Sequence, residues 1–301
     1  MCHLATILPA IRRINFPLSR GQVMLLMLAL NELLLGFETF TAHIISGTVV
    51  PNERIPIWFG TGAGILLLAA GLISYRKRSL AVWIANIVFV LSIVVGLMGA
   101  YFHVVRGIMP DAAVGEKISI FLLVWSPPIL GPLTFSLIGL LGISTVWLED
   151  PAGSGVLRLW GSKRIRLPYS KTRAYFFMVG MGNLATVISS VMDHARTNFT
   201  NPWLWLATSV GIFGAVAAVM LGMLEKPRRS DLIVYAGAMV LMILTGFVGM
   251  LLHIQSDLAA RNTIVIERFL RGAPPFAPML FADMGAIGLI ALLKPDGVGD
   301  N

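Results

Sequence analysis

The segments GLMGAYFH (residues 96–103) and PILGPLTFSLIGLLG (residues 128–142) recur later in the chain as GFVGMLLH (residues 246–253) and PPFAPMLFADMGAIG (residues 274–288). Both copies follow the pattern Gly-x2-Gly-x3-His, then a loop, then Pro-x3-Pro-x2-Phe-x3-Gly-x2-Gly. Only the loop between the two segments differs in length. An internal repeat of this size indicates a fold built by duplication of one unit. The residues that carry the function should therefore lie in the repeated unit.

The composition places the chain in a lipid bilayer. Of 301 residues, 56% are hydrophobic and 13% are charged, and the mean hydropathy is +0.82. A water-soluble fold of this length cannot bury so much apolar surface. The net charge of +8 comes largely from short loops between apolar segments, which is typical of cytoplasmic loops and does not indicate a nucleic-acid partner. The single cysteine, Cys2, excludes a disulfide framework and iron–sulfur ligation by this chain alone.

Eight apolar segments are long enough to cross a bilayer as α-helices, since about 20 residues span about 30 Å of hydrocarbon. They cover residues 22–46, 57–74, 80–104, 118–145, 173–195, 203–224, 230–254 and 273–293. Sixteen of the 23 Lys and Arg residues lie in alternate loops and at the two ends of the chain, which we expect on the cytoplasmic side. The first twenty residues have no signal-peptide cleavage site and are interpreted as a cytoplasmic tail. We therefore predict an all-α, multi-pass inner-membrane protein with both termini in the cytoplasm.

The predicted spans divide into two four-helix repeats. Residues 1–146 and 173–301 hold one repeat each, and residues 147–172 form a basic cytoplasmic linker. Because each repeat has an even number of spans, both enter the membrane from the same side as parallel repeats. Within each repeat we expect an up-down bundle whose first and third helices lie diagonally across the core. Pro132 and Pro278, one turn inside the fourth and eighth spans, are expected to bend those helices or to free a carbonyl group.

Four histidines lie at one depth, near the outer ends of the odd-numbered spans. They are His43, His103, His194 and His253. Helical side chains lean toward the N-terminus, so each imidazole should lie over the residue four positions earlier. Those positions hold small residues, namely Thr39, Gly99, Ser190 and Gly249. Each repeat is thus predicted to place two facing imidazoles above an open slot, which is the arrangement that a bis-histidine haem b requires.

Three interpretations of these histidines stay open. The first is a haem b in each repeat, with His43 paired to His103 and His194 paired to His253. The second is a copper, zinc or iron ion held by imidazole with help from nearby donors, which are Glu38, Asp193, Met192 and Met250. The third is that the four rings are interfacial side chains at the headgroup level, as Trp and Tyr often are.

Polar side chains also lie near the middle of three spans. Asn31 and Glu32 are in the first span, Asn183 is in the fifth and Asp283 is in the eighth. A lone carboxylate at that depth costs on the order of 3 kcal/mol, so we expect each acid to face the protein interior and to be protonated or paired. Glu32 and Asp283 are not equivalent in the repeat, which indicates a proton or quinol task in one repeat only. Glu38 is expected to hydrogen-bond a ligand or substrate on the outer side, or else to be solvated.

The leading hypothesis is an integral membrane redox subunit that binds haem b near the extracytoplasmic face. It would exchange electrons with a quinone in the bilayer or with a periplasmic partner protein. One alternative is a transition-metal transporter or chaperone with Glu32 and Asp283 as a midplane route. Another is a structural membrane subunit of a larger complex.

Overall fold

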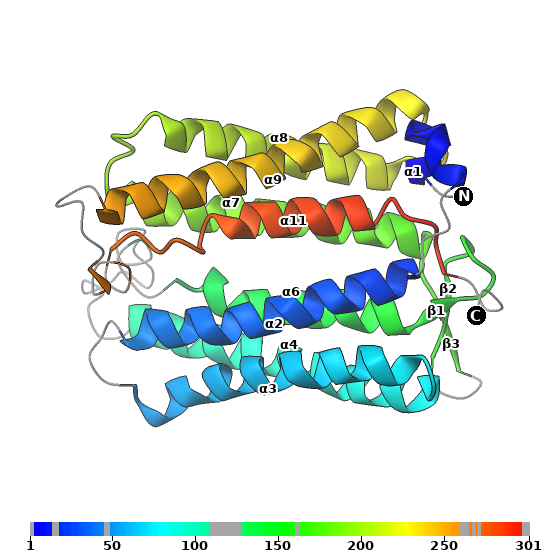
Figure 1. Ribbon diagram of the computed structural model, residues 1–301, viewed down its shortest axis with the longest axis horizontal. Coiled ribbons are helices and arrows are strands. Elements are labelled where there is room, and N and C mark those ends of the chain that lie inside the picture. Colours follow the sequence, from blue (N-terminus) through cyan, green and yellow to red (C-terminus); the bar gives the residue numbers. More distant parts are fainter. Residues whose placement is uncertain are drawn as a thin grey trace.

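The computed structural model describes residues 3–13, 18–44, 49–108, 124, 128–159, 163–258, 265–266, 269 and 272–296. Long helices run side by side along the molecule, and a small β-sheet lies at one end (Figure 1). Among the described residues, six helices are long and apolar enough to cross a membrane. They are α2 (Arg20–Ile44), α3 (Pro51–Ser74), α4 (Arg78–Ile108), α7 (Lys171–Ala195), α8 (Trp203–Met223) and α9 (Arg229–Leu258). Two shorter apolar helices, α6 (Leu130–Val146) and α11 (Met279–Ile290), accompany them.

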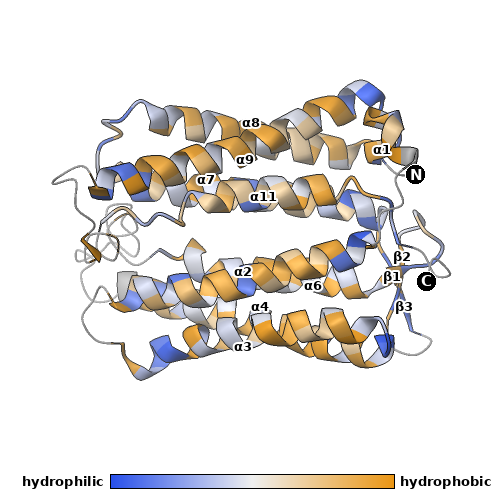
Figure 2. Ribbon diagram, in the orientation of Figure 1, coloured by the Kyte–Doolittle hydropathy of each residue, from blue (hydrophilic) through white to orange (hydrophobic). Residues whose placement is uncertain are grey.

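The helices expose apolar side chains where a soluble protein would expose polar ones. Figure 2 shows hydrophobic residues along the lengths of the helices and hydrophilic residues mainly at their ends and in the sheet. On α3, for example, Trp58 and Leu72 are each 73% exposed. An apolar surface of this extent is stable against lipid, and the backbone polar groups are satisfied inside each helix. The chain is therefore a multi-pass membrane protein.

The eight helices pack as two groups of four. In the first group, α2 and α4 each pack against α3 and α6. In the second group, α7 and α9 each pack against α8 and α11. The helices α2 and α4 therefore lie diagonally across the first group, and α7 and α9 lie diagonally across the second (Figure 1).

Equivalent glycines make a close helix contact in each group. A Cβ atom added to Gly139 on α6 would lie 2.5 Å from the carbonyl oxygen of Phe89 on α4. A Cβ atom added to Gly285 on α11 would lie 2.5 Å from the carbonyl oxygen of Met239 on α9. Only glycine allows these backbones to approach so closely, and such contacts hold helices together in lipid, where no hydrophobic effect between helices does so.

The helices α6 and α11 begin later than the spans predicted over residues 118–145 and 273–293. Most of residues 118–127 lie outside the described part of the chain, and residues 272–278 form bends and turns before α11. Pro132 lies in the first turn of α6 and Pro278 is the N-cap of α11, where a missing N–H costs no intrahelical hydrogen bond. Neither proline therefore bends a helix interior. The structure agrees with the other expected consequence, because Pro132 and Pro278 leave the carbonyl groups of Pro128 and Pro274 without an N–H donor four residues later.

The segment predicted as a linker over residues 147–172 contains a three-stranded antiparallel sheet. Its strands are β1 (Leu148–Glu149), β2 (Val156–Arg158) and β3 (Arg164–Arg166), in the order β1-β2-β3. The central strand pairs Leu157 with Glu149 on one side and with Ile165 on the other. The sequence pattern did not indicate these strands, because strands of two and three residues are too short to show an alternation of apolar and polar residues.

A buried carboxylate fixes the sheet to the second group of helices. Glu149 is 0% exposed, and its oxygen atoms accept hydrogen bonds from the backbone N–H groups of Gly153 (2.8 Å), Gly155 (2.7 Å) and Lys171 (3.0 Å). Lys171 is the first residue of α7, so its N–H has no partner within the helix. One side chain thus anchors both the β1–β2 loop and the start of α7.

The first described residues, in the segment expected as a cytoplasmic tail, form two short helices. They are α1 (His3–Ile7) and the 3-10 helix η1 (Pro9–Arg13). The backbone N–H of Leu4 donates to the carbonyl oxygen of Leu292 at 3.0 Å, and α1 packs against α9. The His3 ring lies 6.1 Å from the Phe176 ring, measured between centres.

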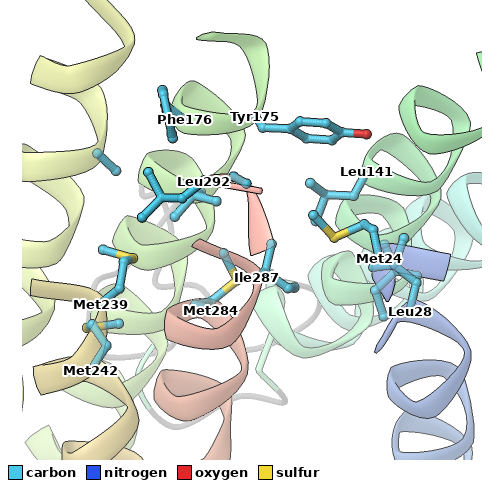
Figure 3. Close-up of a cluster of buried hydrophobic side chains, with 14 of the residues drawn as sticks. Met24, Leu28, Leu141, Tyr175, Phe176, Met239, Met242, Met284, Ile287 and Leu292 are labelled. Atoms are coloured by element: carbon cyan, nitrogen blue, oxygen red, sulfur yellow. The ribbon is translucent and has the colours of Figure 1, made fainter. Parts of the chain in front are cut away.

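One hydrophobic core continues from the first group into the second. It includes Met24 and Leu141 from the first group and Met239 and Ile287 from the second. The Tyr175 side chain extends from α7 toward Leu141 and Met24, as Figure 3 shows. The two groups are therefore parts of a single packed body.

Two buried cations join the groups at the end where the described chain ends lie. Arg20 begins α2, and its Nη1 donates to Thr172 Oγ1 at 2.8 Å and to the carbonyl oxygen of Ala291 at 3.4 Å. Lys171 begins α7, and its Nζ donates to the carbonyl oxygen of Trp147 at 2.8 Å. Ala291 is the C-cap of α11 and Trp147 is the C-cap of α6. Each group therefore places a cation at the C-terminus of the other group's last helix, where unpaired carbonyls and the helix dipole favour positive charge.

Candidate functional site

The four histidines form two pairs, one in each group of helices. The ring centres of His43 on α2 and His103 on α4 are 6.1 Å apart, with an angle of 57° between the ring planes. The ring centres of His194 on α7 and His253 on α9 are 6.0 Å apart, with an angle of 83°. All four residues are partly buried. Because the rings come from diagonal helices, each pair meets across the core of its group, at the end opposite to the β-sheet.

Backbone carbonyl groups orient three of the four rings. His103 Nδ1 lies 2.8 Å from the carbonyl oxygen of Pro128, and His253 Nδ1 lies 2.8 Å from that of Pro274. His43 Nδ1 lies 2.7 Å from the carbonyl oxygen of Thr39. A carbonyl oxygen only accepts, so Nδ1 donates in each case and Nε2 carries the ring lone pair. Metal-binding histidines usually make this second hydrogen bond, which fixes both the tautomer and the ring orientation.

The prolines of the repeat supply two of these carbonyl acceptors. Pro132 has no N–H, so the residue four positions after Pro128 offers no helical donor to the Pro128 carbonyl. Pro278 has the same relation to Pro274, whose carbonyl also accepts from the N–H of Ala277 at 3.3 Å. The pattern Pro-x3-Pro therefore leaves a carbonyl with acceptor capacity, and the histidine of the same repeat donates to it.

The space beside Gly99 and Gly249 is filled, contrary to the slot expected from the sequence. A Cβ atom added to Gly99 would lie 2.8 Å from Pro132 Cβ, and one added to Gly249 would lie 2.7 Å from Pro278 Cβ. The two small residues thus accommodate proline rings and leave no gap there for a flat cofactor. In the other two equivalent positions, Thr39 contributes its carbonyl oxygen to His43, and Ser190 is partly buried.

The ring separation suits two imidazoles on opposite sides of one metal ion. Metal–nitrogen bonds of about 2.0 Å place the two ring centres about 6 Å apart in a trans arrangement and about 5 Å apart at a tetrahedral angle. At separations of 6.1 and 6.0 Å between ring centres, the two histidines of each pair could hold one metal ion between them. Within the described ranges, no group of three or more His, Cys, Asp or Glu side chains is placed to hold a metal ion.

Two acidic residues lie near the histidine pairs, one from each group of helices. Glu38 on α2 and Asp193 on α7 are close enough for their charges to interact. Asp193 also interacts with the positive charge of Arg196. The structure thus brings Glu38 to the boundary between the two groups, at the same end as both pairs.

The polar residues of the helix middles fall into separate contacts. Glu32 on α2 accepts a hydrogen bond from the hydroxyl of Ser92 on α4. The Asn31 side chain lies next to the carboxyl group of Asp283 on α11. Asn183 is 0% exposed in the second group. The contact between Glu32 and Ser92 lies 11 residues, or about 16 Å along the helix axis, from the histidine pair of the first group.

Sequence reasoning missed Ser92, although a signal for it exists. Glu32 lies 11 residues before His43, and Ser92 lies 11 residues before His103. Parallel helices whose histidines meet at one level also bring residues of equal spacing to one level. Arg20, Lys171 and Glu149 were missed as buried charges, because they occur among basic loop residues that the sequence alone assigns to solvent.

Comparison of the chain with protein-family models, curated proteins and solved structures finds no match.

Proposed function

We propose that this protein is an integral membrane redox subunit that binds a haem b at each histidine pair. The observation that supports the proposal is a pair of imidazoles whose ring centres lie about 6 Å apart, which occurs twice in equivalent places and could hold one metal ion in each pair. In each pair at least one ring is oriented by a carbonyl group through Nδ1. Haem iron would supply one-electron chemistry at a potential that its axial ligands set.

The proposal includes a topology of eight membrane crossings in two parallel four-helix repeats, with both termini in the cytoplasm of a bacterial cell. The helices α6 and α11 lie alongside the six longer helices (Figure 1). The basic strand β3 lies at the same end of the molecule as the first and last described residues, and the positive-inside rule assigns such basic segments to the cytoplasm. Both histidine pairs then lie near the extracytoplasmic face, where a quinone in the bilayer or a periplasmic redox protein would exchange electrons.

The residues around the pairs have separate roles in this proposal. Pro128 and Pro274 hold His103 and His253 in one orientation through their carbonyl oxygens. Glu38 and Asp193, between the two groups, provide acceptors for the protons or hydroxyl groups of a quinol.

Absorption spectra of the purified protein, oxidised and reduced, test the proposal. We expect a Soret band and a sharp α band on reduction. His103→Ala and His253→Ala should each remove about half of the bound haem, since each variant destroys one bis-histidine site. His3→Gln is the matched control, because His3 lies outside both pairs, and it should keep the full spectrum. A purified protein without a Soret band, even after addition of hemin, would contradict the proposal.

The proline contacts at Gly99 and Gly249 favour a second candidate function. A bare metal ion needs no room for a macrocycle, so a copper, zinc or iron ion at each pair would fit a transition-metal transporter or chaperone. Elemental analysis of the purified protein separates the two functions. Bound metal without a porphyrin spectrum would support the transporter or chaperone.

A further inference from the structure

Two carboxyl groups lie deep among the helices with oxygen atoms that no described residue satisfies. Glu32 is 0% exposed, and although it accepts from Ser92, its Oε2 has no hydrogen-bond partner in the described part of the chain. Oδ1 of Asp283 is buried and, by the same measure, has none. The amide of Asn31, which is 7% exposed, lies beside Asp283. Glu32 therefore lies in the core of the first group. Asp283 lies at the boundary between the two groups, next to Asn31 of α2.

In the part of the chain that the structure describes, no cation is placed to pair with either acid. Every other acidic or basic side chain on the eight long and short apolar helices lies within two turns of a helix end, including Arg20, Arg78, Lys171 and Arg229. Among the described residues, the helices that pack against α2 and α11, namely α3, α6, α7, α8 and α9, and the helix α4 that carries Ser92, therefore bring no positive charge to this depth. An unpaired charge in such a low-dielectric interior costs several kcal/mol, whereas the neutral acid avoids this cost.

At the repeat-equivalent positions, the corresponding residues pack together without any acidic side chain. Gly182 and Leu137 occupy the positions equivalent to Asn31 and Asp283, and a Cβ atom added to Gly182 would lie 3.1 Å from Leu137 Cδ2. At the positions equivalent to Glu32 and Ser92, the second group has Asn183 and Met242, and both lie next to Gly214. Packing at these places therefore does not require a carboxyl group.

We propose that Glu32, which accepts a hydrogen bond from Ser92, and Asp283, which lies beside Asn31, form two separate proton-binding sites inside the membrane region, one in the first group and one at its boundary with the second. Each carboxyl group holds one proton on one oxygen atom in the resting protein. It releases that proton to become a carboxylate only when a compensating positive charge arrives nearby. The two sites go beyond the proposed redox function, because they rest on burial and the absence of nearby cations among the described residues and require no haem.

Infrared spectroscopy of the full-length protein in lipid tests both sites. The spectrum of Glu32→Gln subtracted from that of the unsubstituted protein should show the carbonyl stretch of a neutral carboxylic acid, and Asp283→Asn should give a second such band. Glu225→Gln is the matched control, because Glu225 is exposed and should contribute carboxylate bands only. If Glu32→Gln and Asp283→Asn also removed carboxylate bands alone, the inference would be overturned.

Two milder variants keep the test decisive if the acid variants fold poorly. Ser92→Ala should shift the Glu32 band without removing it, because the carboxyl loses a hydrogen bond. Asn31→Ala should shift the Asp283 band, because it removes the amide that lies beside this carboxyl group. An unchanged neutral-acid region in both variants would contradict the assignment. The measurement is made before and after hemin addition, so a failure of haem binding does not affect its reading.

Discussion

At the scale of single residues, Pro132 and Pro278 each have two structural effects. Each lacks the N–H that would occupy the carbonyl group four residues earlier, and each ring packs against a glycine of the neighbouring helix. The sequence predicts either a bent helix or a freed carbonyl group at both places. It does not predict that a histidine donates to that carbonyl, because the loop that brings the two together differs in length between the repeats and has no pattern of its own.

Substitution of Gly249 tests this contact. Gly249→Ala places a methyl group against the Pro278 ring, so we expect it to lower the free energy of unfolding by roughly 1–3 kcal/mol. Gly237→Ala, on the same helix, is the matched control, since a Cβ atom there meets nothing within 4 Å. It should leave stability unchanged or raise it by up to about 1 kcal/mol, because alanine is the better helix former. Unfolding of both variants in the same detergent measures the difference, and equal stabilities would contradict the packing described here.

At the scale of elements, the long helices are predictable and the short elements are not. The span predicted over residues 203–224 and the helix α8 differ by one residue at the C-terminal end. The five-residue helix α1 and the strands of the sheet are shorter than the window in which a hydrophobic period becomes visible. Tertiary contacts form these elements, so their presence depends on partners such as Glu149 and Leu292 that a local pattern cannot identify.

The buried Glu149 gives a prediction for the sheet. Glu149→Ala leaves three backbone N–H groups without their acceptor, and each unsatisfied group costs about 1–3 kcal/mol if it stays buried. We therefore expect the β1–β2 loop and the sheet to open, with faster hydrogen exchange over residues 153–158. Asp150→Ala is the control, since Asp150 forms a largely exposed ion pair with Arg164 at 3.4 Å, which contributes at most about 1 kcal/mol. Equal exchange in the two variants would show that Glu149 does not anchor the loop.

The docking of α1 should depend on pH through His3. Burial is the main cause that lowers the pKa of His3 from its ordinary value of 6.5, and the positive charges of the chain's N-terminus and then of Arg20 lower it further. The undocked state then binds more protons than the docked state, so docking is fully stable above pH 6.5 and weakens as the pH falls through that value. Hydrogen exchange of residues 4–7 at pH 7.5 and pH 5.5 measures this dependence. His3→Gln should abolish it, and an equal pH dependence in that variant would assign the effect to another group.

At the scale of the whole molecule, two similar groups of helices share one core and differ in their polar contacts. The internal repeat predicts the similarity, and the equal depth of the histidines predicts which of them meet. The boundary between the groups is not predictable in the same way. A face that packs against protein and a face that contacts lipid are both apolar, so hydropathy does not tell them apart. Two features of the boundary therefore appear only in the structure. Asn31 lies next to Asp283, and Arg20 and Lys171 each donate to a carbonyl group of the other group of helices.

Arg20 and Lys171 should act together in stabilising the contact between the two groups of helices. Arg20 and Lys171 are 3% and 2% exposed, and their charged groups lie 5.1 and 5.9 Å from the centre of the Tyr175 ring. Arg20→Met and Lys171→Met keep most of the apolar stem but lose the hydrogen bonds of the charge, so each should destabilise the protein by roughly 1.5–3 kcal/mol. Arg76→Met, in an exposed loop, is the control and should change stability by less than about 0.5 kcal/mol.

Because both cations contact one aromatic ring, the double variant should differ from the sum of the single variants by more than about 0.5 kcal/mol. Unfolding of the four variants in one detergent completes the cycle, and additive losses would mean that each cation caps its helix independently of the other.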